Sequence, residues 1–256
     1  AVTLAAMLGS STAKCAVAAC IILVVIGSSW TVMPSAIRKP AIYSFVAMVA
    51  QLQFTGPLDY FYTADHSCVE NGPQFTMTFY LTTASIAAAF CGAFGVGFFE
   101  AVMGSWTFRN LFRFTTVLMC MVASVDVAIV TRTNLAIGIS DRTAYLGGNA
   151  CFGSVIIMMH TIPMAVLTSK MCPSGAESLV YAIVAGMQNL GFSISGLAGS
   201  GVAETFNVTF SKTNCSYSHL STLLIVSTMV MPLLITFPLT FILIPPKIGL
   251  KDKLDT

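Results

Sequence analysis

Residues 75–99 read FTMTFYLTTASIAAAFCGAFGVGFF, a run of 25 residues without Asp, Glu, Lys or Arg. A helix of this length rises about 37 Å, which is enough to cross the roughly 30 Å hydrocarbon core of a bilayer. Every backbone N–H and C=O inside that core needs a hydrogen-bond partner, and a helix supplies all of them within one segment. The stretch therefore predicts a transmembrane helix.

Similar uncharged stretches recur along the whole chain. Of its 256 residues 56% are hydrophobic and only 9% are charged, whereas soluble domains carry about a quarter charged residues. The net charge of +2 gives no reason to expect nucleic acid as a partner. We predict an all-α fold, a polytopic helical bundle in the lipid bilayer. Seven spans are expected, over residues 15–33, 40–62, 75–99, 114–131, 143–169, 178–203 and 220–246.

The basic residues between these spans predict an orientation. If the first short loop faces the cytoplasm, that side holds eight basic residues: Arg38, Lys39, Arg109, Arg113, Lys170, Lys247, Lys251 and Lys253. The other side holds four: Lys14, Arg132, Arg142 and Lys212. Cytoplasmic loops are enriched in Lys and Arg, so the split favours this orientation.

The predicted outer loops carry two further features. Both N-x-S/T sequons, at Asn207 and Asn214, fall in one of these loops, where glycosylation is possible. Cys68 and Cys215 also lie in outer loops, and a disulfide between them requires Cα atoms within about 7 Å. Five other cysteines are interpreted as small apolar packing residues: Cys15, Cys20, Cys91, Cys120 and Cys151.

A few polar residues interrupt the uncharged stretches. Asp126, in MVASVDVAIV, is costly if it is ionised against lipid, so we expect it to carry a proton or bind a cationic group. The alternative is a carboxyl that is protonated or paired with a neighbouring helix. His160 relays a proton or only hydrogen bonds between helices. In the span over 178–203, Gln188 and Asn189 begin a broad stripe of Gly, Ser and amide side chains, which predicts tight helix contacts and also a wet cavity.

No enzyme motif, cofactor-binding motif or metal-ligand spacing is present, so we do not expect an enzyme. The topology of seven spans is also that of a seven-helix receptor, although no NPxxY run precedes the short tail. A seven-helix receptor would be a signalling protein, and it is kept as an alternative to a carrier that moves a solute across the membrane.

Four segments resemble one family. They are GPLDYFYTADHSCVENGPQFT at 56–76, RTNLAIGISDRTAYLGG at 132–148, SKMCPSGAESLVYAIVAGMQNLG at 169–191 and PLLITFPLTFILIP at 232–245. In this order and at these separations they resemble the folate/biopterin transporter family of the major facilitator superfamily, in its kinetoplastid-type branch. The chain departs from the family pattern at Glu70 and Arg142.

The resemblance implies about twelve helices in two halves. Residues 40–246 would form the C-terminal half, with its six helices, and residues 247–256 a cytoplasmic tail. Residues 1–39 would be part of the N-terminal region with one span, possibly the sixth helix, and the rest of the first half would be missing. Only about six residues separate the first two predicted spans, which is short for the middle of such a carrier. Because the sequence starts at Ala1 without an initiator Met, an inactive, truncated half-transporter is a further alternative.

The resemblance also implies a function and a set of site residues. We expect proton-coupled uptake of folate, biopterin or a related metabolite such as S-adenosylmethionine across the plasma membrane. Tyr60 or Tyr62 would stack on a pterin ring, and Asp126 with Gln188 and Asn189 would bind its edge. Arg142 would bind a glutamate tail. Gating or salt-bridge roles are expected for Asp59, Asp141, Arg109, Pro173 and Glu177.

Overall fold

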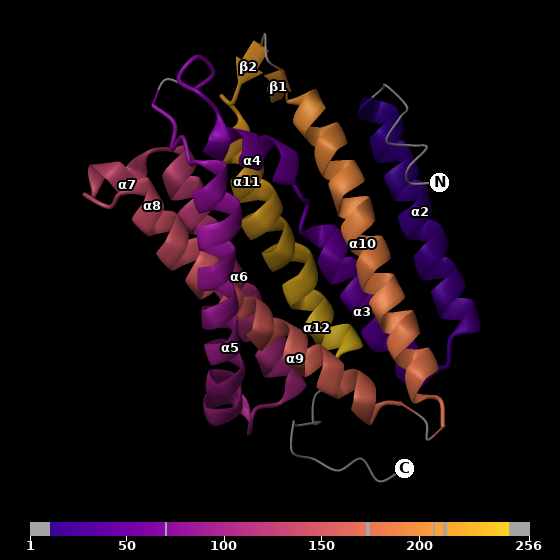
Figure 1. Ribbon diagram of the computed structural model, residues 1–256. Coiled ribbons are helices and arrows are strands. Elements are labelled where there is room, and N and C mark those ends of the chain that lie inside the picture. Colours follow the sequence, from indigo (N-terminus) through magenta and orange to yellow (C-terminus); the bar gives the residue numbers. More distant parts are fainter. Residues whose placement is uncertain (1–10, 70, 173–174, 207, 212–213, 246–256) are drawn as a thin grey trace.

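The computed structural model of the chain describes residues 11–69, 71–172, 175–206, 208–211 and 214–245 (Figure 1). Within these ranges six helical segments are long and apolar enough to cross a membrane. They are Ser11–Val32, Thr78–Met103, Phe108–Val130, Asp141–Lys170, Glu177–Thr205 and Leu220–Leu243. The predicted all-α polytopic fold is confirmed, and the protein is an integral, multi-pass membrane protein.

The elements follow one another in a simple order. The first are α2 (Ser11–Val32), α3 (Ser35–Ala50), α4 (Thr55–Thr63), η1 (Thr78–Thr83), α5 (Ala84–Met103) and α6 (Phe108–Val130). Next come α7 (Thr133–Ala136), α8 (Asp141–Ala144), η2 (Tyr145–Gly153), α9 (Ser154–Lys170) and α10 (Glu177–Thr205). A short antiparallel hairpin, β1 (Thr209–Ser211) and β2 (Asn214–Ser216), precedes α11 (Leu220–Leu224), η3 (Ile225–Val230), η4 (Pro232–Thr236) and α12 (Phe237–Leu243).

The span predicted over residues 40–62 is divided in the structure. Helix α3 ends at Ala50, and α4 begins at Thr55, so that residues 51–54 are not helical. Pro57 explains the break, because in a continuous helix its ring would meet the carbonyl of Gln53. In the first turn of α4 the same proline is tolerated, since its missing N–H has no intrahelical partner there. The prediction of one continuous span was wrong at this point.

Helix α10 lies against α3 and the break through its small residues. Gly191 faces the backbone of α3, where an added Cβ would lie 2.7 Å from the carbonyl oxygen of Phe45. Gly199 faces the break, and an added Cβ there would overlap the carbonyl oxygen of Gln53. Ser195 between them is fully buried. This part of the predicted polar stripe therefore serves close helix packing.

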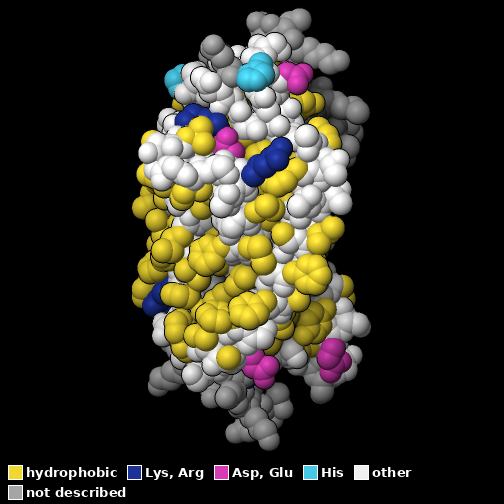
Figure 2. Space-filling model, turned by 60° about the vertical axis from the view of Figure 1, so that its left-hand side comes forward, with side chains coloured by type: hydrophobic (Ala, Val, Ile, Leu, Met, Phe, Trp, Pro, Cys, Tyr) yellow, Lys and Arg dark blue, Asp and Glu magenta, His cyan; other side chains and the backbone are white. Residues whose placement is uncertain are grey.

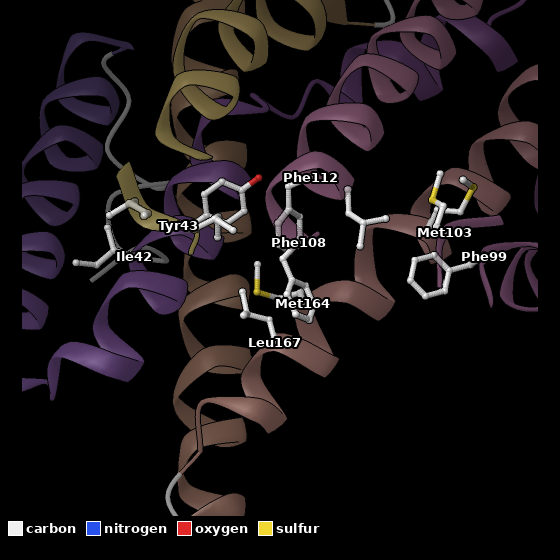
Figure 3. Close-up of a cluster of buried hydrophobic side chains, with 12 residues drawn as sticks. Ile42, Tyr43, Phe99, Met103, Phe108, Phe112, Met164 and Leu167 are labelled. Carbon is white, nitrogen blue, oxygen red and sulfur yellow. The ribbon is translucent and has the colours of Figure 1, made fainter. Parts of the chain in front are cut away.

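A cluster of large apolar side chains joins α3, α5, α6, α9 and α12 (Figure 3). Tyr43 of α3 packs on Phe112 of α6 with ring centroids 5.1 Å apart. Phe108 and Leu167 are fully buried beside them. This cluster fixes the relative positions of the helices that surround the cavity described below.

Charged side chains lie mainly toward the two ends of the bundle, and apolar side chains cover the middle of the face in Figure 2. One end carries β1, β2 and α4, and we call it the hairpin end (Figure 1). The connections from α2 to α3, α5 to α6 and α9 to α10 lie at the opposite end (Figure 1). An apolar belt between polar ends is the arrangement that a bilayer requires.

Two pairs of cysteines are bonded in the structure. Cys68, after α4, is joined to Cys215 of β2 with a Cα–Cα distance of 5.4 Å. Cys91 of α5 is joined to Cys151 of η2 with a Cα–Cα distance of 5.0 Å. The second pair differs from the expectation that both residues only fill space, because the contact between α5 and η2 brings their side chains together.

We predict that the Cys68–Cys215 bridge stabilises the hairpin end. Replacing both residues by Ser is expected to lower the free energy of unfolding by about 2 to 5 kcal/mol, since the unfolded chain gains the entropy of an open loop. Thermal unfolding in detergent measures the change. Cys20→Ser is the control, because Cys20 is an unbonded, exposed cysteine of α2. An unfolding temperature equal to that of the parent protein would contradict the bridge.

Candidate functional site

The break in the second predicted span opens onto a cavity of about 320 Å³ inside the bundle. Its walls come from the break itself, α4, α6, η2, α9, α11 and η3. Most of the lining side chains are apolar. The polar ones are Gln51, Gln53, Asp59, Asp126, Asn149 and Thr228.

Asp126 of α6 is the most enclosed acid of this cavity. Its Oδ1 accepts hydrogen bonds from the hydroxyl of Tyr62 and from Nδ2 of Asn149. Hydrogen bonds to a charged group contribute about 1.5 to 3 kcal/mol each, which is comparable with the 2.5 to 3.5 kcal/mol cost of inserting an acid at the centre of a membrane helix. The two donors therefore make a carboxylate tolerable at this depth.

Gly148 allows Asn149 to lie beside Asp126. Gly148 faces α6, and an added Cβ would lie 2.6 Å from a methyl group of Val125. Only a residue without a side chain lets η2 come this close to α6. Asn149 follows in the chain and thereby comes within reach of the carboxylate one residue after Val125.

Aromatic rings hold Tyr62 in place. Its ring stacks on Phe75 at a centroid distance of 5.6 Å and meets the edge of Tyr145 at 5.2 Å. Tyr62 is almost completely buried, with 1% of its surface exposed. This packing restricts the orientation of the Tyr62 ring, and its hydroxyl is directed at Asp126.

Asp59 of α4 is a second acid that lines the cavity. Its Oδ1 accepts a hydrogen bond from the hydroxyl of Tyr80, and Asp59 itself is exposed. The rings of Tyr62 and Tyr80 lie 5.9 Å apart. The cavity thus holds two carboxylates, each bonded to a phenol, and the two phenols belong to one aromatic cluster.

Three other residues expected at the site lie elsewhere. Gln188 and Asn189 of α10 do not line the cavity, and Asn189 is exposed on the outside of the described bundle. His160 of α9 is buried, with its Nδ1 3.0 Å from the hydroxyl of Thr115 on α6. The structure thus places His160 in a contact between two helices, outside the cavity lining.

The two expected residues at the hairpin end are exposed. Arg142 lies with its guanidinium 5.5 Å from the ring centroid of Phe79, which belongs to the same aromatic cluster as Tyr145. Tyr60 has 54% of its surface exposed and does not line the cavity. Neither residue reaches Asp126.

Two of the residues expected to act in gating, Asp141 and Arg109, are held by hydrogen bonds to neighbouring protein groups. Asp141 accepts hydrogen bonds from Arg132 at 2.7 Å and from Asn134 at 2.8 Å. Arg109 donates to the backbone carbonyls of Phe241 and Ile244 at the end of α12.

Glu177 accepts the backbone N–H of Gly175 at 3.0 Å, at the start of α10. Pro173 and Asn207 lie outside the described residues, and of Asn214 only the backbone, in β2, is described.

Several lining residues were missed by sequence reasoning. Asn149 is a polar residue in an otherwise apolar span, the same signal that drew attention to Asp126. Gln51 and Gln53 flank the break, and Pro57 was the available signal for that break. Tyr80, which does not line the cavity but donates to Asp59, gave no signal, because a tyrosine near the end of a predicted span is common at membrane interfaces.

The fold and the cavity together define a class, namely a multi-pass helical membrane protein with a largely apolar cavity between its helices that holds two acids. The model of the BT1 family matches residues 6–256. The chain belongs to the BT1 family.

Curated relatives agree with this assignment. The chain is 27% identical over 183 residues to "Probable folate-biopterin transporter 6" of Arabidopsis thaliana, a match that covers 72% of this chain and 35% of the relative. It is 25% identical over 130 residues to "Folate-biopterin transporter" of Synechocystis sp., covering 51% of this chain and 26% of the relative. The matched region thus spans about a third of the length of these relatives, or less. No solved structure matches the chain.

Proposed function

We propose that this chain is part of a membrane transporter that moves a pterin-containing or related metabolite. The observation that carries the proposal is the cavity at the helix break, with Asp126 held between Tyr62 and Asn149 inside a membrane bundle. An intramembrane carboxylate beside a cavity is expensive to keep and commonly marks a path for a solute or ion. The names of the relatives support a carrier over a seven-helix receptor or an inactive remnant.

The finer features of the proposal follow the resemblance. Folate, biopterin and S-adenosylmethionine are the candidate solutes, and Asp126 is the candidate carrier of a coupling proton. Broken helices next to a central site are a recurring feature of secondary transporters, which supports a facilitator-type mechanism with this chain as the C-terminal half. The plasma membrane is the proposed location.

Uptake measurements test the proposal. The full-length protein, expressed in cells that lack such a carrier, is expected to accumulate labelled folate, biopterin or S-adenosylmethionine, and an imposed proton gradient is expected to increase the rate. The control is the same cells with the empty vector. No uptake of any of the three solutes, with the protein present in the membrane, would contradict the proposed substrates.

A further inference from the structure

We infer that the cavity recognises a ligand through its hydrogen-bond donors or a delocalised cation, such as the edge of an aminated nitrogen heterocycle, and excludes the ligand's own carboxylates. The inference rests on the proposed function and names the part of the solute that this cavity binds. It is carried by the two carboxylates of the lining, whose Oδ2 atoms accept no hydrogen bond among the described residues, and by the lack of Lys and Arg in the described lining.

The two carboxylates each keep one oxygen for a ligand. In Asp126 both protein donors reach Oδ1, and in Asp59 the Tyr80 hydroxyl also reaches Oδ1. Among the described residues no hydrogen bond is made to Oδ2 of either acid. A carboxylate oxygen that lines a cavity without a partner is a strong acceptor.

The hydroxyl donors around the cavity, and one N–H of each lining amide, are already engaged. The single hydroxyl proton of Tyr62 and that of Tyr80 go to the carboxylates. Thr228 donates its hydroxyl to the carbonyl of Leu224 at 2.6 Å. An N–H of Gln51 points to Met119 Sδ, and one of Gln53 points to the backbone carbonyl of Gln51. The groups left to face a ligand are therefore one N–H and one oxygen of each amide, together with the carboxylate oxygens, which carry the negative charge of the cavity.

Among the residues that the structure describes, no Lys or Arg lines the cavity. An anionic group placed here would meet two carboxylates at low dielectric without a counter-charge, which is unfavourable. A heterocycle with an exocyclic amino group next to a ring N–H offers neighbouring donors, and an unengaged carboxylate oxygen is a strong acceptor for them. Apolar walls that include Met119, Ile156 and Leu224 suit the faces of its ring. A ligand's glutamate tail would then lie outside this cavity.

Competition between two pteridines of similar shape tests the inference. In membranes that contain the full-length protein, 2,4-diaminopteridine is expected to displace labelled biopterin at a concentration at least about tenfold lower than pteridine-2,4-dione, because carbonyl oxygens replace both exocyclic amino groups in the dione and would face the carboxylates. The preference is expected to shrink in Asp59→Asn. Glu100→Gln is the matched control, since Glu100 is exposed on α5 and does not line the cavity. Equal displacement by the two compounds in the parent protein would overturn the inference and leave the transport proposal intact.

If biopterin does not bind at all, biopterin is excluded as a solute and the inference is tested separately. The purified protein is then heated with each pteridine. A rise in unfolding temperature with the diamino compound alone, which is lost in Asp126→Asn, supports donor recognition. The absence of any rise in the parent protein, or an equal rise in Asp126→Asn, overturns it.

Discussion

Replacement of Asp126 by Asn is expected to reduce solute uptake below detection while the amount of protein in the membrane stays unchanged. The amide still offers one oxygen to Tyr62 and Asn149. It replaces the second carboxylate oxygen by an N–H donor and can no longer take up a proton. Losing a hydrogen bond to a charged group alone costs about 1.5 to 3 kcal/mol, or roughly 10- to 150-fold in binding.

Two variants serve as controls for this result. Glu100→Gln makes the same chemical change on an exposed position of α5 and is expected to transport like the parent protein. Tyr62→Phe removes one donor to Asp126 and keeps the carboxylate, so we expect it to reduce uptake only in part. Uptake at the parent rate in Asp126→Asn would assign the residue to helix packing.

Gly199→Ala is expected to destabilise the protein more than a Gly→Ala replacement at any other glycine of α10. The new Cβ would overlap the carbonyl oxygen of Gln53, and backbone atoms cannot move aside without shifting the whole break. Overpacking of this kind costs about 1 to 3 kcal/mol, which exceeds the gain of up to about 1 kcal/mol from replacing Gly by Ala in a helix. Thermal unfolding of the purified protein measures the loss.

Gly196→Ala is the matched control on the same helix. An added Cβ at Gly196 meets nothing within 4 Å, so only the gain in helix propensity remains. This variant is expected to be as stable as the parent protein or slightly more stable. Equal stability of the two variants would mean that α10 does not approach the break as closely as described.

Uncharged length alone was enough to predict six of the spans, because a membrane helix must satisfy its own backbone. The helix break was missed because hydropathy does not register a non-helical turn, although Pro57 disfavours a continuous helix at that point. The cavity could not be predicted from the sequence, because its walls come from segments that are far apart in the chain. Asp126 and Tyr62 were expected at a site, but their direct contact depends on the packing of α4 on α6 at Ile129 and the neighbouring apolar residues.

Gln188 and Asn189 were also expected at the site, but the structure places them outside the cavity. Residue type matched them to a pterin edge, but the small residues of the same stripe pack on α3 and on the break, and neither amide lines the cavity that holds Asp126. Helical spacing gives the angular position of a side chain around its own helix. It does not say which neighbour that side of the helix will meet.

The separation of the two cysteines at the hairpin end has a consequence for biosynthesis. They are 147 residues apart in sequence, and ribosomes add about 5 to 20 residues per second. Cys68 must therefore wait about 7 to 30 s as a free thiol before Cys215 is synthesised. During this interval the Cys68 thiol can form a disulfide with a cysteine other than Cys215. Such a bond has to be exchanged before the native bridge forms.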